Sequence, residues 1–144
     1  GAVASRPLRR GERLLKERPL LEVETDRASA LDDEAVWSEL DQRLRQQLAG
    51  LPIDQQTAFW ELEDSFREPK SAAGILYTNA VYCDGQAMLF PKMSRLNHSC
   101  RPNVVHSWQA EDGALVLHAT RAIQHGEELT LCYVPAFLAR EERR

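Results

Sequence analysis

Residues 94–103 read "SRLNHSCRPN" and concentrate several chemically reactive side chains in one short segment. The four consecutive residues from Asn97 to Cys100 bring an amide, an imidazole, a hydroxyl and a thiol together. Pro102 prevents a regular element from running through the segment. These residue types fit four kinds of site: a nucleophile with its base, a metal corner, a glycosylation acceptor, or part of a pocket for a small molecule.

Composition describes an ordinary globular chain. Its 144 residues suit one domain, and 43% of them are hydrophobic while 28% are charged. The longest apolar runs are only a few residues long, so no membrane partner is expected. The net charge is −4, and no sustained basic run is present outside the extreme C-terminus, where Arg140, Arg143 and Arg144 lie. We therefore expect no direct contacts to nucleic acid. We also expect a monomer.

The three cysteines, Cys83, Cys100 and Cys132, are spaced 17 and 32 residues apart. An odd number at wide intervals predicts neither a disulfide framework nor a complete zinc site. We therefore expect an intracellular protein, in the nucleus or the cytoplasm. The glycosylation pattern that begins at Asn97 then carries no meaning, because it is used only in secreted chains.

The nucleophile and the metal corner both depend on His98 and Cys100. Positions i and i+2 of a strand point the same way, so the imidazole could activate the thiol. However, no third residue that would orient the imidazole can be identified, and a structural zinc ion needs four ligands. The sequence therefore shows neither the orienting residue that a nucleophile needs nor the further ligands that a zinc site needs.

The first half of the chain changes its hydrophobic period. Within residues 1–27, apolar patches between turn signals predict two short strands. Residues 31–67 predict a pair of helices. The first helix is capped by Asp32 or Asp33, ends at Gly50, and has an apolar stripe of Leu31, Ala35, Val36, Leu40, Leu44 and Leu48. The second is capped by Asp54, ends before Pro69, and has a stripe of Ala58, Phe59, Leu62 and Phe66.

From Ser71 onward the runs "GILYTNAVY", "AMLF", "NVVHSW", "ALVLHA" and "ELTLCY" predict short strands. The turn residues Glu111-Asp112-Gly113 predict a hairpin between two of them. No internal repeat is evident. The predicted fold is therefore mainly β, with many short strands and an inserted helical pair.

Four segments taken together resemble one family. They are "RPLRRGERLLKERPLL" (6–21), "GILYTNAVY" (74–82), "SRLNHSCRPN" (94–103) and "RAIQHGEELTLCY" (121–133). The combination resembles the SET-domain protein lysine methyltransferases, particularly the fungal-type branch related to the SET–MYND enzymes. The resemblance covers nearly the whole chain.

This resemblance implies a fold of several small curved β-sheets, in which the C-terminal segment threads beneath an earlier loop as a pseudoknot. It places the SET domain at residues 1–137, with residues 31–67 as an insertion and residues 138–144 as a tail. It also implies S-adenosylmethionine as cofactor and a lysine-containing protein, histone or non-histone, as methyl acceptor. Acceptors other than proteins stay open.

The resemblance also implies which residues hold the cofactor. Asn97 and His98 match the family's Asn-His pair, and Ser94 matches a further cofactor contact. Asn79 matches a position that faces the methionine moiety and the target lysine. Tyr133 matches the catalytic tyrosine, which contacts the cofactor and aligns the methyl group with the attacking amine.

Val81, together with Asn79, falls where the family lines the channel for the target lysine. We expect no bound metal, because Cys100 matches a zinc ligand only together with a cysteine-rich post-SET segment. The chain ends at Arg144, about where that segment would start, and Gly1 aligns with the last glycine of the family's Gly-x-Gly stretch. We therefore expect a chain truncated before the post-SET segment, and a catalytically impaired SET-like module that binds cofactor or protein is the alternative.

Overall fold

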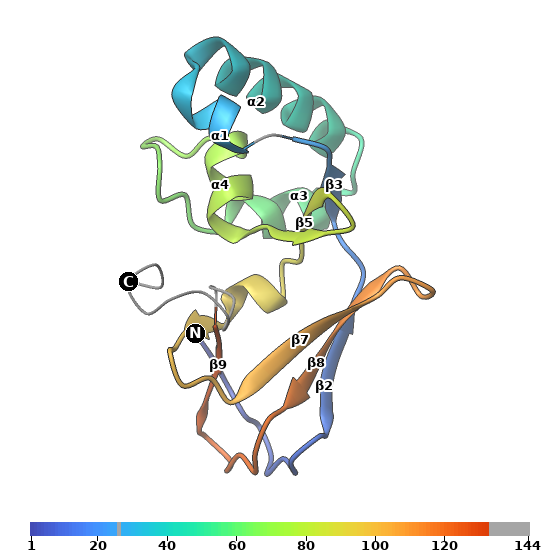
Figure 1. The fold of residues 1–144 in the computed structure, drawn as a ribbon. Helices are drawn as coiled ribbons and strands as arrows, with labels where there is room; N and C mark the ends of the chain where they lie inside the picture. Colours follow the sequence, from blue (N-terminus) through green and yellow to red (C-terminus); the bar gives the residue numbers. More distant parts are fainter. Residues whose placement is uncertain (26, 133–144) are drawn as a thin grey trace. The chain divides into compact units, whose positions relative to one another are not determined.

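The computed structural model describes residues 1–25 and 27–132 (Figure 1). The chain forms two compact units. The first consists of residues 1–18 and the chain from Arg95 onward, and the second of Pro19–Ser94. Each unit has its own sheets and its own buried side chains. No helix in the described part of the chain is long and apolar enough to cross a membrane.

The larger sheet of the first unit has three antiparallel strands in the order β2 (Arg13–Glu17), β8 (Ala114–Ala119) and β7 (Val104–Gln109) (Figure 1). β8 lies in the centre, and its apolar side chains are buried. The turn from β7 to β8 contains the predicted Glu111-Asp112-Gly113. Gly113 has a φ of 59°, in the left-handed region that favours glycine. The predicted hairpin is confirmed.

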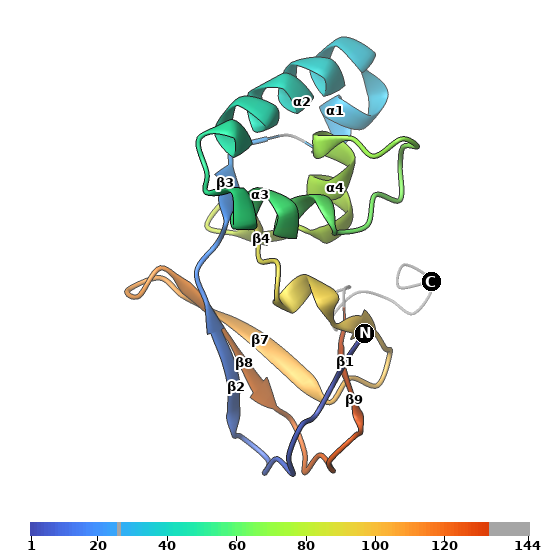
Figure 2. The ribbon, with the colours of Figure 1, turned by 180° about the vertical axis from the view of Figure 1, so that it is seen from behind.

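The smaller sheet of the first unit joins the two ends of the chain. Its order is β1 (Ala2–Val3), β9 (Glu128–Leu131) and β6 (Asn97–His98), and Figure 2 shows β1 beside β9. β1 pairs with β9 in antiparallel fashion, whereas β6 pairs with β9 in parallel. The Asn-His pair therefore lies alongside the last described strand, which is the pairing that a threaded C-terminal segment needs.

The sheet of the second unit has the order β3 (Leu21–Val23), β5 (Gln86–Leu89) and β4 (Val81–Cys83). A single 3-10 turn, η1 (Met93–Arg95), follows β5 in the chain. β3, together with β2 in the first unit, confirms the two short strands predicted near the start of the chain. The runs predicted as strands from residue 87 onward are confirmed as β5, β7, β8 and β9.

The second unit also contains the predicted first helix. A short helix, α1 (Arg27–Asp32), precedes α2 (Glu34–Ala49). The carboxylate of Asp33 accepts a hydrogen bond from the backbone N–H of Ala35 at 2.8 Å, and α2 ends at Gly50. Both predicted boundaries are therefore confirmed. Asp33 suits the cap position because its carboxylate satisfies backbone donors that the first turn of a helix leaves unpaired. The buried face of α2 consists of Trp37, Leu40, Leu44 and Leu48.

The predicted stripe is wrong at its N-terminal end. Leu31 is 43% exposed and Val36 is 36% exposed, whereas Trp37 is only 5% exposed. The large indole ring fills the space against Tyr77, with 5.9 Å between the ring centroids. A bulky aromatic side chain buries more apolar surface than valine, so it takes the inward position.

The predicted second helix is shorter than expected. α3 spans Ile53–Trp60 and begins after Pro52, with no side-chain cap, so Asp54 is not its cap. Leu62 is buried beyond the end of the helix, whereas Phe66 is 39% exposed. The segment after Trp60 is therefore no longer helical, but it still contributes Leu62 to the core.

The run at residues 74–82 is predicted as strand, but its first part, residues 74–79, belongs to helix α4 (Ala72–Asn79). Its last two residues, Val81 and Tyr82, are strand and belong to β4. The hydroxyl of Ser71 accepts a hydrogen bond from the backbone N–H of Gly74 at 2.9 Å and caps the helix. Residues 72–77 are all buried, so the helix has no polar face. A short helix of this kind cannot be told from a buried strand by periodicity.

Candidate functional site

The Asn-His pair is held in the first unit by its parallel pairing with β9. Asn97 lies opposite Thr130 and His98 opposite Leu131. The pairing continues beyond the strand, because Ser99 donates its backbone N–H to the carbonyl of Leu131 at 2.8 Å. The side chains of Asn97 and His98 are both exposed. The backbone is therefore fixed while two polar side chains remain accessible to a ligand.

The side chain of Asn97 is oriented by Glu128. Its Nδ2 donates to Glu128 Oε1 at 2.7 Å, and both residues are exposed. Gly1 lies against the same two groups: a Cβ atom there would be 2.7 Å from Asn97 Nδ2 and 2.8 Å from Glu128 Oε1. Three backbone segments thus converge on one polar point, and the closeness of Gly1 requires the absence of a side chain.

His98 and Cys100 lie on one side of the chain, as predicted for positions i and i+2. Cys100 Sγ is 3.6 Å from His98 Nε2, and the thiol is exposed. Within the described part of the chain, no group of three or more His, Cys, Asp or Glu side chains could hold a metal ion. Two side chains alone are too few for a structural zinc ion, which needs four ligands.

Asn103 fastens the loop that follows the Asn-His pair to β9. Its side chain is 2% exposed, and its Nδ2 donates to the backbone carbonyl of Glu128 at 2.8 Å. Its Oδ1 accepts the backbone N–H of Thr130 at 2.9 Å. One buried amide thereby replaces two backbone bonds that an ordinary strand neighbour would make. We infer that it fixes the register between this loop and β9.

Two of the predicted site residues, Asn79 and Val81, lie in the second unit. Asn79 is the last residue of α4, and its Nδ2 donates to the carbonyls of Glu63 at 2.9 Å and of Ile75 at 2.8 Å. Val81 begins β4 opposite Met88 and is partly exposed. The amide nitrogen of Asn79 is thus committed to the backbone, which leaves its Oδ1 as the atom that could face a ligand.

The loop before α4, which Asn79 contacts, is organised by Asp64. Its carboxylate accepts backbone N–H groups from Phe66 at 2.8 Å, Arg67 at 2.9 Å and Ser71 at 2.8 Å. Partial burial raises the pKa of Asp64, but these hydrogen bonds outweigh it and hold the pKa below its ordinary value. A Cβ atom at Gly74 would collide with the carboxylate, so the glycine lets this loop approach α4.

Ser94 and Tyr133 complete the predicted set. Ser94 lies in η1, and its Oγ donates to the carbonyl of Phe90 at 2.8 Å. Its hydroxyl can therefore meet a ligand only as an acceptor. Tyr133 lies outside the described residues, two positions after the end of β9.

The structure adds Glu128 and Asn103, which the sequence analysis did not single out. Glu128 follows Glu127, and two adjacent carboxylates at the start of a strand must point to opposite faces. That alternation was the available signal for Glu128. The signal for Asn103 is weaker: it is an amide residue between Pro102 and two valines, directly before a strand.

Comparison with known proteins gives the context of this site. The family model of the SET domain matches residues 1–134. A crystal structure of a candidate histone methyltransferase from Plasmodium falciparum superimposes with a TM-score of 0.51 over 95% of this chain and 85% of that chain. Its sequence identity is 11%, so this likeness concerns the fold alone. It confirms the mainly β SET fold that the sequence predicted.

Three curated relatives are similar in sequence. Histone-lysine N-methyltransferase SMYD3 from Homo sapiens is 46% identical over 95 residues, which cover 58% of this chain and 22% of that protein. The Mus musculus protein of that name is 36% identical over 89 residues, covering 58% and 20%. Histone-lysine N-methyltransferase set5 from Schizosaccharomyces pombe is 27% identical, covering 100% and 41%.

The chain thus spans less than half the length of these relatives. The match of the family model, however, extends over almost all of its residues, including the Asn-His pair and β9. This chain therefore belongs to the SET-domain family.

Proposed function

We propose that this chain binds S-adenosylmethionine at the Asn97–Glu128 point and transfers its methyl group to the side chain of a protein lysine. The single observation that carries the proposal is the convergence of Gly1, Asn97 and Glu128, where a Cβ atom at Gly1 would fill the space. The names of the relatives, all histone-lysine methyltransferases, support the reaction and the class of acceptor.

The residues present fit the cofactor. It would supply a methyl group on a positively charged sulfur, ready for displacement by an amine. Because Glu128 takes one N–H of Asn97, the amide is held with its Oδ1 and second N–H turned to other partners. The exposed imidazole of His98 adds a further polar contact. An amide fixed by a carboxylate presents both a donor and an acceptor, which suits the polar groups of a nucleoside or amino acid.

The family resemblance assigns the methionine moiety and the lysine to Asn79, Ser94 and Val81. Asn79 offers only its Oδ1, an acceptor suited to an ammonium or amine hydrogen. Ser94 likewise offers an acceptor, while Val81 adds apolar surface to the lysine channel. The lysine must be neutral to attack, and an apolar channel beside a positive charge lowers its pKa. Tyr133 would align the amine by a hydrogen bond from its hydroxyl.

The experiment that tests this function measures methyl transfer from labelled S-adenosylmethionine to histones and to proteins of a cell extract, with mass spectrometry of the modified residue. We expect a methylated lysine, and Tyr133→Phe should lose roughly thirty- to a thousand-fold in rate, or about 2–4 kcal/mol. Tyr77→Phe is the matched control, because the hydroxyl of Tyr77 bonds only to Thr25 at 2.6 Å among the described residues.

Transfer to another residue type would contradict the proposed acceptor. A Tyr133→Phe variant with more than half the parent rate would remove Tyr133 from the mechanism. If the parent binds S-adenosylmethionine but methylates nothing, the alternative of an impaired SET-like binding module is correct. A reaction of this kind would take place where lysine-rich proteins are found, in the nucleus or the cytoplasm.

A further inference from the structure

The first unit contains an internal repeat that the sequence analysis missed. "RPLRRGERL" (6–14) and "RAIQHGEEL" (121–129) share an arginine, an aliphatic residue, Gly-Glu and a final leucine at the same five positions. The two segments are 115 residues apart, so the repeat has no visible period. The structure shows that the matching residues also make matching contacts.

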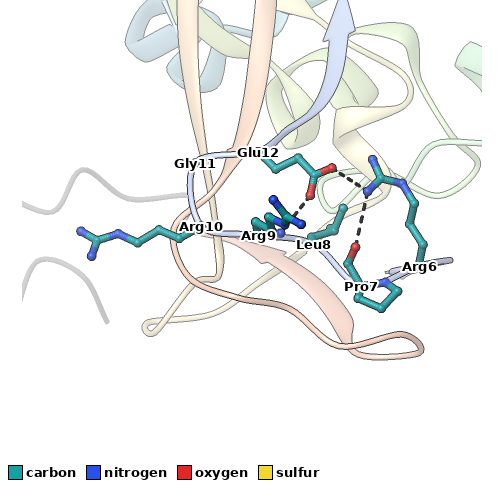
Figure 3. Close-up of a pocket in the computed structure, with 7 residues that line it drawn as sticks. All are labelled: Arg6, Pro7, Leu8, Arg9, Arg10, Gly11 and Glu12. Atoms are coloured by element: carbon teal, nitrogen blue, oxygen red, sulfur yellow. Dashed lines mark hydrogen bonds and ion pairs between the residues drawn. The ribbon is translucent and has the colours of Figure 1, made fainter.

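In the first copy, a glutamate closes the loop by two hydrogen bonds. Arg6 Nη1 donates to Glu12 Oε1 at 2.6 Å, and the backbone N–H of Arg9 donates to Glu12 Oε2 at 2.9 Å (Figure 3). The bonds from the Arg9 backbone and the Arg6 guanidinium hold the pKa of Glu12 below its ordinary value. The residues that close this loop are therefore fully engaged with each other.

The second copy closes in the same way. Arg121 Nη2 donates to Glu127 Oε1 at 2.5 Å, and the backbone N–H of Gln124 donates to Glu127 Oε2 at 2.9 Å. The bonds from the Arg121 guanidinium and the Gln124 backbone again hold the pKa of the glutamate down. Each distance agrees with its counterpart in the first copy to within a tenth of an ångström.

The two copies also face each other. Leu8 donates its backbone N–H to the carbonyl of Ile123 at 2.8 Å, and Ile123 returns the bond to Leu8 at 2.9 Å. Both side chains are buried, at 7% and 1% exposure. An antiparallel bridge between equivalent residues is what a local two-fold relation produces.

The glycines of the two copies obey the same relation. Gly11 donates its N–H to the carbonyl of Ala119 at 2.8 Å, and Gly126 donates to the carbonyl of Ala4 at 2.7 Å. Their φ angles are 81° and 82°, in the left-handed region. The positions that both copies share are therefore those that the fold needs.

Four positions differ between the copies: Pro7 stands where the second copy has Ala122, and the other three positions differ in charge. The first copy has Arg9, Arg10 and Arg13, whereas the second has glutamine, histidine and glutamate at the corresponding places, 124, 125 and 128. The second copy builds the same loop without these arginines. The fold therefore does not require them, and another role has to account for the charge.

The three arginines are accessible. All are exposed, and among the described residues their guanidinium groups make no hydrogen bond or ion pair. Residues 6–12 line an open concavity of about 760 Å³, where Figure 3 shows Arg6 turned toward Glu12 and Arg10 extending away from both. Residues 6–13, the arginine loop, contain four arginines and one glutamate in a chain whose net charge is −4.

We propose that the arginine loop binds an acidic segment of a protein partner. Guanidinium groups match carboxylates in bidentate geometry, and three separate exposed guanidinium groups suit a run of carboxylates better than one small anion. Nucleic acid fits less well. Duplex binding typically uses about 6–10 phosphate contacts, more than three side chains on an acidic chain supply. The loop also has no aromatic side chain on which a single-stranded base could stack.

The test measures anisotropy of a fluorescein-labelled octaglutamate peptide titrated with the 144-residue chain at low salt. Arg9→Gln with Arg10→His installs the residues of the second copy, so the loop should stay folded. We expect this double variant to weaken binding by about tenfold or more, and physiological salt to weaken the parent similarly. Arg18→Gln with Arg43→Gln, which removes the same charge elsewhere, is the control and should bind as the parent does.

Three results would overturn the proposal. One is no binding of the peptide at roughly 1 mM protein, where even a weak site is occupied. Another is an equal loss in both double variants, which would make binding a matter of net charge alone. The third is tighter binding of a 20-base-pair DNA duplex than of the peptide, with the same sensitivity to Arg9 and Arg10, which would assign the loop to nucleic acid. Methyl transfer does not enter this test, so its outcome is independent of the proposed function.

Discussion

Replacing Asn103 with aspartate tests the link between the Asn-His loop and β9 with little change in shape. In Asn103→Asp, one carboxylate oxygen can still accept the backbone N–H of Thr130, now bonded at 2.9 Å. The other oxygen takes the place of Nδ2, which donates to the carbonyl of Glu128 at 2.8 Å. Two acceptors then face each other in a site that is 2% exposed.

The expected cost follows from these contacts. The unpaired carbonyl costs about 1–3 kcal/mol, and the buried carboxylate adds a desolvation penalty, so we expect about 3–5 kcal/mol at pH 8. Burial raises the pKa of the new carboxyl in the folded state above its unfolded value of about 3.9. The penalty is therefore present at pH values above the folded pKa and is lost as the pH falls toward the unfolded value. Once protonated, the acid can again donate to Glu128.

Urea unfolding followed by circular dichroism at pH 8 and pH 5, with the parent measured in parallel, gives the difference in unfolding free energy at each pH. We expect the deficit of Asn103→Asp to shrink by at least about 1.4 kcal/mol, the equivalent of one pKa unit. Asn103→Ala loses both hydrogen bonds without a titratable group, so its deficit of about 2–4 kcal/mol should not depend on pH. A deficit below about 1 kcal/mol, or one equal at both pH values, would refute the clamp.

Three further outcomes are expected. Gly74→Ala should lower the free energy of unfolding by about 1–3 kcal/mol, because the added methyl group would collide with the Asp64 carboxylate. In an Asp64→Ala background the same substitution should be neutral or stabilising. Additive effects in a double-mutant cycle would contradict the contact. Glu128→Ala should weaken S-adenosylmethionine binding by about five- to tenfold, with most of it restored in Glu128→Gln, which still accepts from Asn97; equal losses would argue for the charge instead. Burial raises the pKa of the Cys83 thiol, so its alkylation by iodoacetamide at pH 8, followed by mass spectrometry, should be slower than that of a peptide thiol, and an equal rate would disprove its burial.

The sequence was most informative where local chemistry decides structure. Asp33 and Gly50 bound α2 as predicted, because caps and turn glycines act within a few residues of their own position. The hairpin at residues 111–113 follows the same logic. The resemblance was carried by short segments whose spacing and residue types are both distinctive, and the family assignment followed from them.

The sequence-based predictions for α3 and α4 are wrong because tertiary contacts, not local sequence, determine these segments. α4 cannot be recognised as a helix from the sequence, because every residue from 72 to 77 is apolar or small and lies in the core, so no helical period is visible. α3 ends at Trp60 because Asp64 instead gathers the following backbone into a loop. No local sequence pattern predicts that the Asp64 carboxylate accepts hydrogen bonds from three backbone N–H groups.

Long-range pairing was out of reach as well. β1 pairs with β9 across nearly the whole chain, and the register places Val3 opposite Glu128. The parallel pairing of β6 with β9 brings Asn97 to Glu128, and the pairing of β1 with β9 brings Gly1 to the same place. The sequence shows neither pairing, so it predicts Asn97 but not its partners. The repeat that underlies the arginine loop is hard to detect in the sequence for a related reason: only five of nine positions are shared or similar, and the copies lie at opposite ends of the chain.

The measurement that bears most directly on the central claim is a calorimetric titration of the chain with S-adenosylmethionine. We expect one site per chain in the parent. Asn97→Ala should weaken binding by about tenfold or more, since it removes a polar side chain that Glu128 and Gly1 hold in place. Gln46→Ala, an equally conservative loss on the exposed side of α2, should leave the affinity unchanged. Absence of binding in the parent, or a folded Asn97→Ala variant with the parent's affinity, would contradict the account.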